Sequence, residues 1–209
     1  MPSLSTRSYA ELINLPAYEQ IRILHEQKYP KANDGLFKMP YYSTALSGIR
    51  QFYKGGNDKS ALKDALDKAA VLKGPGKSTH NSRVLNLFIN SSASSRSLTN
   101  LKLTINLTYD LGSDVSIRLK FDVEGDERGR RKYIFFNCRD APLEPQIATD
   151  ALSIACWILQ KNGVKLRQGD VEFYDLKSGA HLTISKTSQK SITKMKNNVQ
   201  VIASLWPNV

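Results

Sequence analysis

The middle of the chain alternates hydrophobic and polar residues with the period of two that is typical of β-strands. The segment 101–109 places leucine, isoleucine and tyrosine on one face and lysine, threonine and asparagine on the other. The segment 115–123 repeats this pattern after the turn sequence DLGSD, and the segment 132–138 is apolar on both faces. Because a strand with two apolar faces is buried on both sides, the pattern predicts a three-strand antiparallel meander whose third strand is the more central one.

Elsewhere the hydrophobic residues recur every three or four positions, which is the period of a helix that buries one face. The segments expected to be helical are 8–15, 16–29, 41–56 and 58–74 near the N-terminus, and 146–162 and 188–206 after the meander. The segments 171–176 and 181–186 indicate a hairpin around the sequence KSGA. The expected fold is mixed α/β, of the α+β kind: a mixed central sheet that contains the meander, a helix that crosses it and an N-terminal helical region. We expect a helical region 1–73 and a core 74–209 that form one compact unit.

The charge of the chain points to a class of partner. Its 209 residues include 30 lysines and arginines against 19 aspartates and glutamates, which gives a formal net charge of +11. Such an excess attracts polyanions, so nucleic acid, either DNA or RNA, is the first partner to consider. A basic surface can also serve solubility alone, or address an acidic surface on a protein partner.

Cysteine usage and hydropathy exclude some classes of protein. Cys138 and Cys156 lie in apolar segments without the C-x-x-C spacing or the nearby histidines of a zinc site, so we expect buried thiols. The first residues carry no charged segment followed by an apolar core, and no apolar run approaches the roughly 18 residues of a membrane span. We therefore expect no membrane contact and a cytoplasmic or other intracellular location, which would be the host cell for a protein of a virus or mobile element.

The stretch RLKFDVEGDERGRRKYIFFNCRD, residues 118–140, gathers basic side chains around one predicted strand pair. Together with lysines of the last predicted helix they would form a phosphate-contacting surface if they lie on one side. The candidate nucleic-acid contacts are Arg118, Lys120, Arg128, Arg130, Arg131, Lys132, Lys190 and Lys194. The alternative is a solvated hairpin turn. Tyr133, Phe135 and Phe136 alternate in the same stretch and could either stack on bases or pack into the core.

A set of polar residues marks the predicted elements between residues 76 and 177. The sequence GKSTH holds Gly76 and His80, and Asp122 lies in the second predicted strand. Asn137, Cys138 and Arg139 end the third strand, and Gln146 opens the following helix. With its order of helix, three-strand meander, crossing helix and further strand, this part of the chain resembles the RecB-like branch of the PD-(D/E)XK nuclease superfamily. That family has a G-x-x-x-H pattern, a strand aspartate, an E-x-K strand and a helix glutamine in the corresponding places.

The resemblance implies a Mg²⁺-dependent phosphodiester site with Asp122 as a metal ligand and with Asp122, His80 and Arg139 as candidate catalytic residues. The chain departs from the family because Asn137 replaces the metal-binding carboxylate and Arg139 replaces the lysine that orients the attacking water. Mg²⁺ prefers carboxylate oxygens, and an arginine can hold a phosphate but cannot take a proton from water. The pattern therefore indicates that binding is retained and cleavage is lost. Three other carboxylates could restore the ligand set if they converge on this site: Glu124, Asp126 and Asp140.

The sequence YDLKSG at 174–179 offers a second match to the same branch, with its D-x-K-x-G strand and with Gln189 on the last predicted helix. It lacks a matching aspartate on a preceding strand. A polar strand end that turns at Gly179 is the simpler interpretation.

Three functions are consistent with these residues. The first is a nucleic-acid-binding protein on a degenerate nuclease-like core, which acts by occupancy and needs no cofactor. The second is an active nuclease centred on Asp122, which would use Mg²⁺. The third is a protein-binding inhibitor or assembly subunit.

Overall fold

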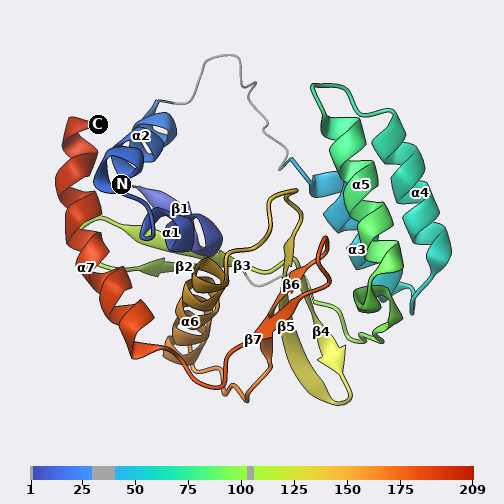
Figure 1. Cartoon of the computed structure of the whole chain (residues 1–209). Helices are drawn as coiled ribbons and strands as arrows, with labels where there is room; N and C mark the ends of the chain where they lie inside the picture. Colours follow the sequence, from blue (N-terminus) through green and yellow to red (C-terminus); the bar gives the residue numbers. More distant parts are fainter. Residues whose placement is uncertain (1, 30–40, 103–105) are drawn as a thin grey trace.

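The computed structural model describes residues 2–29, 41–102 and 106–209, and these residues form a mixed α/β fold (Figure 1). The helices are α1 (Thr6–Leu12), α2 (Ala17–Lys28), α3 (Ser43–Lys54), α4 (Lys59–Ala70), α5 (Lys77–Asn90), α6 (Pro145–Lys161) and α7 (Gln189–Leu205). The strands are β1 (Ser3–Ser5), β2 (Asn106–Asp110), β3 (Ser116–Lys120), β4 (Val123–Glu127), β5 (Arg130–Asn137), β6 (Val171–Asp175) and β7 (His181–Thr183). Short 3-10 helices, η1 (Ser92–Ser95) and η2 (Trp206–Asn208), follow α5 and α7.

The predicted fold class is confirmed, with an N-terminal helical region and with α6 packed on the sheet. Helix α6 matches the predicted helix 146–162, and β6 and β7 form the predicted antiparallel hairpin. The hydrophobic periodicity did not predict helix α5, although the family resemblance implied a helix at Gly76 and His80. Its sequence KSTHNSRVLNLFIN contains several serines and asparagines, which are weak helix formers, and its stability comes from packing Val84, Leu85 and Phe88 into a core.

The described strands form two sheets, with the orders β1-β3-β2 and β4-β5-β6-β7. The predicted strand 115–123 is therefore corrected: β3 ends at Lys120 in the first sheet, and β4 begins at Val123 in the second. Phe121 packs in one hydrophobic core and Val123 in the other, so the apolar alternation continues although the chain changes sheets. The expected meander is divided into two antiparallel pairs, β2–β3 and β4–β5, one in each sheet.

The first and third predicted strands differ in extent from the strands that the structure contains. Of the segment 101–109, only 106–109 falls within β2; positions 101 and 102 lie outside a strand, and 103–105 lie outside the described residues. The segment 132–138 corresponds to β5, which is central because β4 and β6 flank it. Phe135 faces the first core and Phe136 the second. The two apolar faces of this strand thus reflect burial on both sides.

The second sheet separates the two hydrophobic cores (Figure 1). Helices α1, α2, α6 and α7 enclose the first core together with the first sheet, and α3, α4 and α5 cover the opposite face of the second sheet. Strands β5 and β6 are parallel, and α6 supplies the crossover that a parallel pair requires. Cys138 and Cys156 are buried as expected, and burial raises the pKa of each thiol to about 12.

The N-terminal strand β1 was not predicted. It pairs in parallel with β3, with Ser3 opposite Ser116, and it buries Leu4 completely. Helices α1 and α2 contribute to the first core, whereas α3 and α4 contribute to the second. The predicted helical region 1–73 therefore shares its cores with the rest of the chain.

A buried polar network joins the turn after α1 to α6 and α7. Asp150 of α6 is fully buried (0% exposed) and accepts hydrogen bonds from Asn14 at 2.8 Å and Ser191 at 2.6 Å. Gln146 adds a third hydrogen bond at 3.0 Å, and the ammonium group of Lys194 lies 3.7 Å away. Because a buried carboxylate is stable only when it is paired and hydrogen-bonded, this network determines how the three helices meet.

Replacing Asp150 by alanine is expected to lower the free energy of unfolding by about 3 kcal/mol, because its donors lose their acceptor and a nearby lysine loses its countercharge. Urea unfolding followed by circular dichroism measures this change. The control Asp67→Ala, at an exposed position of α4, should change the same quantity by less than about 0.5 kcal/mol. Equal small effects in the two variants would show that the network does not stabilise the fold.

Candidate nucleic-acid interface

Asp122 lies where the chain passes from the first sheet to the second, and it is buried there (6% exposed). Its Oδ2 accepts a hydrogen bond from the backbone N–H of Phe136 at 2.8 Å, and its Oδ1 accepts one from Arg7 at 3.3 Å. Arg7 also donates to the carbonyl oxygen of Phe136 at 2.7 Å, and Arg50 donates to the carbonyl oxygen of Asp122 at 3.1 Å. Asp122 therefore ties α1 to β5 at the crossing between the sheets, which is a structural role.

The Mg²⁺ ion of the nuclease alternative does not fit this arrangement. Both carboxylate oxygens of Asp122 already accept hydrogen bonds, and the amide of Asn137 donates to Asp175 at 3.2 Å. Across residues 2–29, 41–102 and 106–209, no three histidine, cysteine, aspartate or glutamate side chains gather as a metal-ligating group. One carboxylate without a group of converging ligands is a poor Mg²⁺ site, and the described residues around Asp122 provide no such group.

The three carboxylates that could have restored a ligand set are paired with basic side chains. Arg131 contacts Glu124 at 3.4 Å and Asp126 at 3.1 Å. Asp140 lies 2.9 Å from the ammonium group of Lys177. Each of these carboxylates thus has a local cation as its partner.

His80 and Arg139 do not join Asp122 in one site. Arg139 pairs with Glu11 at 2.7 Å, and His80 shares a hydrogen bond of 2.8 Å with the hydroxyl group of Tyr41. Arg139 lines a cleft of about 330 Å³ at the end of β5, and the described residues that line this cleft include neither Asp122 nor His80. The candidate catalytic residues are therefore distributed over separate environments.

The other residues on which the resemblance to the nuclease superfamily rests have structural roles. Gly76 precedes α5 with φ +67°, a left-handed conformation that favours glycine. Gln146 donates its hydrogen bond to Asp150, within the network between the helices. The backbone carbonyl oxygen of Asp175 accepts a hydrogen bond from the backbone N–H of Gly179 at 2.8 Å, so the sequence YDLKSG forms a strand end and a turn.

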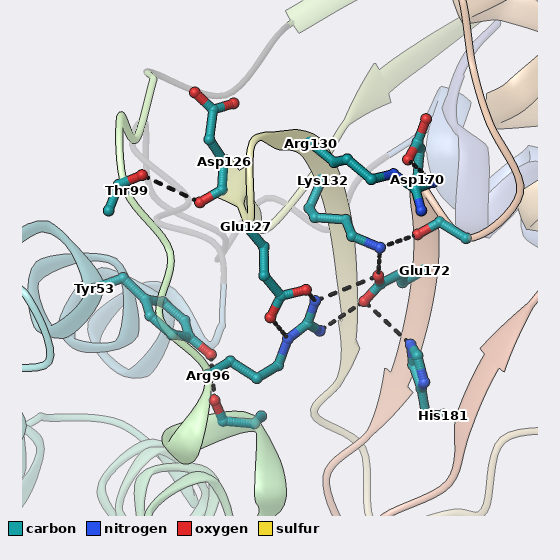
Figure 2. Close-up of polar contacts among 12 residues, drawn as sticks. Tyr53, Arg96, Thr99, Asp126, Glu127, Arg130, Lys132, Asp170, Glu172 and His181 are labelled. Carbon is teal, nitrogen blue, oxygen red and sulfur yellow. Dashed lines mark hydrogen bonds and ion pairs between the residues drawn. The ribbon is translucent and has the colours of Figure 1, made fainter.

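Three of the four hairpin cations that were predicted to contact phosphate are neutralised within the fold (Figure 2). Arg130 lies 2.5 Å from Asp170, and Lys132 lies 2.6 Å from Glu172. Arg131, the third of these cations, holds the two carboxylates of β4 described above. Because an ion-paired cation offers little net charge to a phosphate, these three residues are weak candidates for contacts with nucleic acid.

Arg96 is the centre of a charge network that the sequence analysis missed (Figure 2). It follows η1 and lies 2.7 Å from Glu127 of β4 and 2.6 Å from Glu172 of β6. Burial alone would raise the pKa of Glu172, but hydrogen bonds from His181, Arg96 and Lys132 outweigh this effect and lower the pKa to about 2. No motif surrounds Arg96 in its serine-rich loop, so local sequence carried no signal for this role.

Arg118 and Lys120 differ from the hairpin cations because they are exposed on the outer face of the first sheet. Arg118 donates to the carbonyl oxygen of Ser3 at 3.4 Å, and neither side chain has a carboxylate partner among the described residues. Ile117 and Leu119 point to the opposite side of the strand and are fully buried. Strand β3 therefore presents two adjacent cations to solvent.

The structure does not gather all eight predicted basic residues on one surface. Arg128 is exposed in the turn between β4 and β5, where its φ is +50°. Lys190 is exposed on α7, whereas Lys194 belongs to the network around Asp150.

The variant Arg131→Glu is expected to lower the free energy of unfolding by about 3 kcal/mol, because the new carboxylate would face Asp126 and the buried Glu124. Urea unfolding measures the change. Arg128→Glu reverses the same charge at the exposed turn and should alter stability by less than about 0.5 kcal/mol. Similar losses in both variants would contradict the importance of the ion pairs.

Glu172 is expected to make stability depend on acid. Its folded pKa, about 2, is below its ordinary value of 4.5, so its contribution is complete above pH 4.5 and is lost as the pH falls towards 2. Glu172→Gln lacks this contribution. The stability advantage of the wild type over the variant should therefore shrink by about 3 kcal/mol across that interval, as measured by urea unfolding at several pH values. An advantage that does not change with pH would argue against the lowered pKa.

Comparison with known proteins adds no relative from which a role could be transferred. No protein-family model matches this sequence, and no curated protein matches it either. The described helices include no segment with the length and hydrophobicity of a membrane span. The likeness to the nuclease superfamily therefore stays a prediction from the residues quoted above.

Proposed function

We propose that this protein binds nucleic acid through the outer face of its first sheet and acts by occupancy, without cleaving its ligand. The observation that carries the proposal is the pair Arg118 and Lys120, which are exposed and have no carboxylate partner in the part of the chain that the structure describes. The formal net charge of +11 adds a long-range attraction for polyanions.

The two cations suit phosphate contacts because they project from the same face of one strand. Residues two positions apart on a strand are separated by about 6–7 Å, so both side chains can reach the backbone of one nucleic-acid strand. Each contact that neutralises a phosphate releases counterions, which makes the affinity depend on salt.

The neighbouring strands supply uncharged polar groups to the same face, together with one carboxylate of β2, Asp110. Thr108 of β2 and Ser5 of β1 are paired opposite Arg118. Asn106 of β2 is paired opposite Lys120. Hydroxyl and amide groups contact phosphate and sugar without reading the base sequence, so weak sequence dependence is expected and both DNA and RNA fit.

We expect no cleavage of the ligand, because the candidate catalytic groups have other partners. Asp122 is engaged by Arg7 and by the backbone of β5, and Arg139 is paired with Glu11.

The double variant Arg118→Glu/Lys120→Glu is expected to weaken binding similarly for all sequences and to flatten the dependence of log affinity on log salt by about 1.4–1.8. Fluorescence anisotropy of labelled oligonucleotides, titrated over a range of salt concentrations, measures both quantities. The matched control is Lys59→Glu/Lys63→Glu, two exposed positions of α4 on the other side of the second sheet (Figure 1). This control should change the dependence of log affinity on log salt less than the Arg118→Glu/Lys120→Glu variant does.

Three results would overturn the proposal. Equal losses in the two double variants would remove the first sheet from the binding surface. Absence of any binding at low salt would favour the protein-binding alternative. Cleavage of the oligonucleotide with Mg²⁺ present, abolished by Asp122→Ala in a folded protein, would favour the nuclease alternative.

A further inference from the structure

Trp157 of α6 lies in a cluster of aromatic and basic side chains at the edge of the first sheet. Tyr109 of β2 meets its partly exposed ring edge-on, with the ring centroids 4.9 Å apart and the planes at 69°. The ammonium groups of Lys161 and Lys196 each lie 5.9 Å from the centroid of the indole ring. Helices α6 and α7 thus bring two cations to a single indole, and β2 brings a tyrosine.

This cluster has an excess of positive charge. Neither Lys161 nor Lys196 has a carboxylate partner within the described ranges of the chain. A phosphate placed beside the ring would meet a cation that no carboxylate of the described residues already neutralises. The ring provides a flat apolar surface on which a base can stack, and the two lysines provide cations for the phosphates of the backbone.

The other aromatic residues considered for base stacking are not accessible. Tyr133, Phe135 and Phe136 are 5%, 1% and 1% exposed, so they serve as core residues. The second of the two tryptophans, Trp206, lies beyond α7, where the ammonium group of Lys28 sits 5.8 Å from its ring and donates to its carbonyl oxygen at 2.8 Å.

The position of the cluster connects it to the proposed binding face. Strand β2 is the edge of the first sheet, and its residue Thr108 lies opposite Arg118 on the outer face. The next residue, Tyr109, points to the inner side, where Trp157 lies. A ligand that contacts both Arg118 and Trp157 must bend around one strand. A single strand can do so, whereas duplex DNA is stiff, with a persistence length of about 150 base pairs.

We propose that Trp157 stacks on an unpaired base while Lys161 and Lys196 contact the phosphates beside it, so that the ligand is single-stranded nucleic acid. This inference rests on the proposed function and specifies its substrate class. Stacking on an indole tolerates every base, which agrees with a face that contacts the backbone alone.

The first test uses tryptophan fluorescence. In a Trp206→Phe protein, Trp157 is the remaining tryptophan of the two in the chain. Titration with single-stranded oligothymidylate should quench its emission in parallel with a rise in the anisotropy of the labelled oligonucleotide. A duplex of the same length should raise the anisotropy, at higher concentration, with little quenching.

The second test uses substitutions of the ring in the full-length chain. Trp157→Leu should weaken binding to the single strand by about tenfold and leave duplex binding unchanged, whereas Trp157→Phe should retain most of the single-strand affinity. Circular dichroism establishes that each variant is folded, and the quenching experiment gives an answer with Trp157 intact if the leucine variant does not fold.

The outcomes separate this inference from the proposed function. Anisotropy that rises without quenching, or equal losses on single strand and duplex in the folded leucine variant, would overturn the stacking site and leave the sheet face as the binding surface. No rise in anisotropy with either oligonucleotide at low salt would overturn both.

Discussion

The crossing between the two sheets is the constraint on which the rest of this architecture depends. A chain that leaves one sheet and enters another exposes backbone groups that the regular ladders do not pair, and those groups must find partners when they are buried. Here the carboxylate of Asp122 accepts the backbone N–H of Phe136, and Arg7 bridges that carboxylate to the carbonyl oxygen of Phe136. Because Arg7 belongs to α1, the same contacts hold the N-terminus, the crossing and the central strand β5 together.

Charge pairing decides which basic residues remain available to a ligand. The chain carries a formal charge of +11, yet the densest basic run in its sequence, on the β4–β5 hairpin, is largely matched by carboxylates. Arg96, in a loop distant in sequence, forms ion pairs with both β4 and β6 and so links the two strands. The cations left to solvent on β3 and around Trp157 are fewer and less conspicuous along the chain. A basic segment is therefore a poor guide to a basic surface when acidic neighbours come from other strands.

The comparison with a nuclease pattern shows the same limit for a catalytic site. Spacing along the chain placed Asp122, His80 and Arg139 on elements of a suitable order. Their partners are Arg7, Tyr41 and Glu11, respectively, and none of these could be identified from the spacing. A candidate ligand or base is defined by the groups that its side chain faces, and those groups come from distant parts of the sequence.

By itself, the sequence determined the elements whose signals are local. The helical period predicted α6, the hydrophobic run predicted that β5 is buried on both faces, and the turn residues predicted the β6–β7 hairpin. Only the tertiary structure decided the division into two sheets, the parallel pairing of β1 with β3, and the partners of each charge. The physical reason is sequence separation: Asn14 meets Asp150, and Arg96 meets Glu172, through contacts that no periodicity along the chain records.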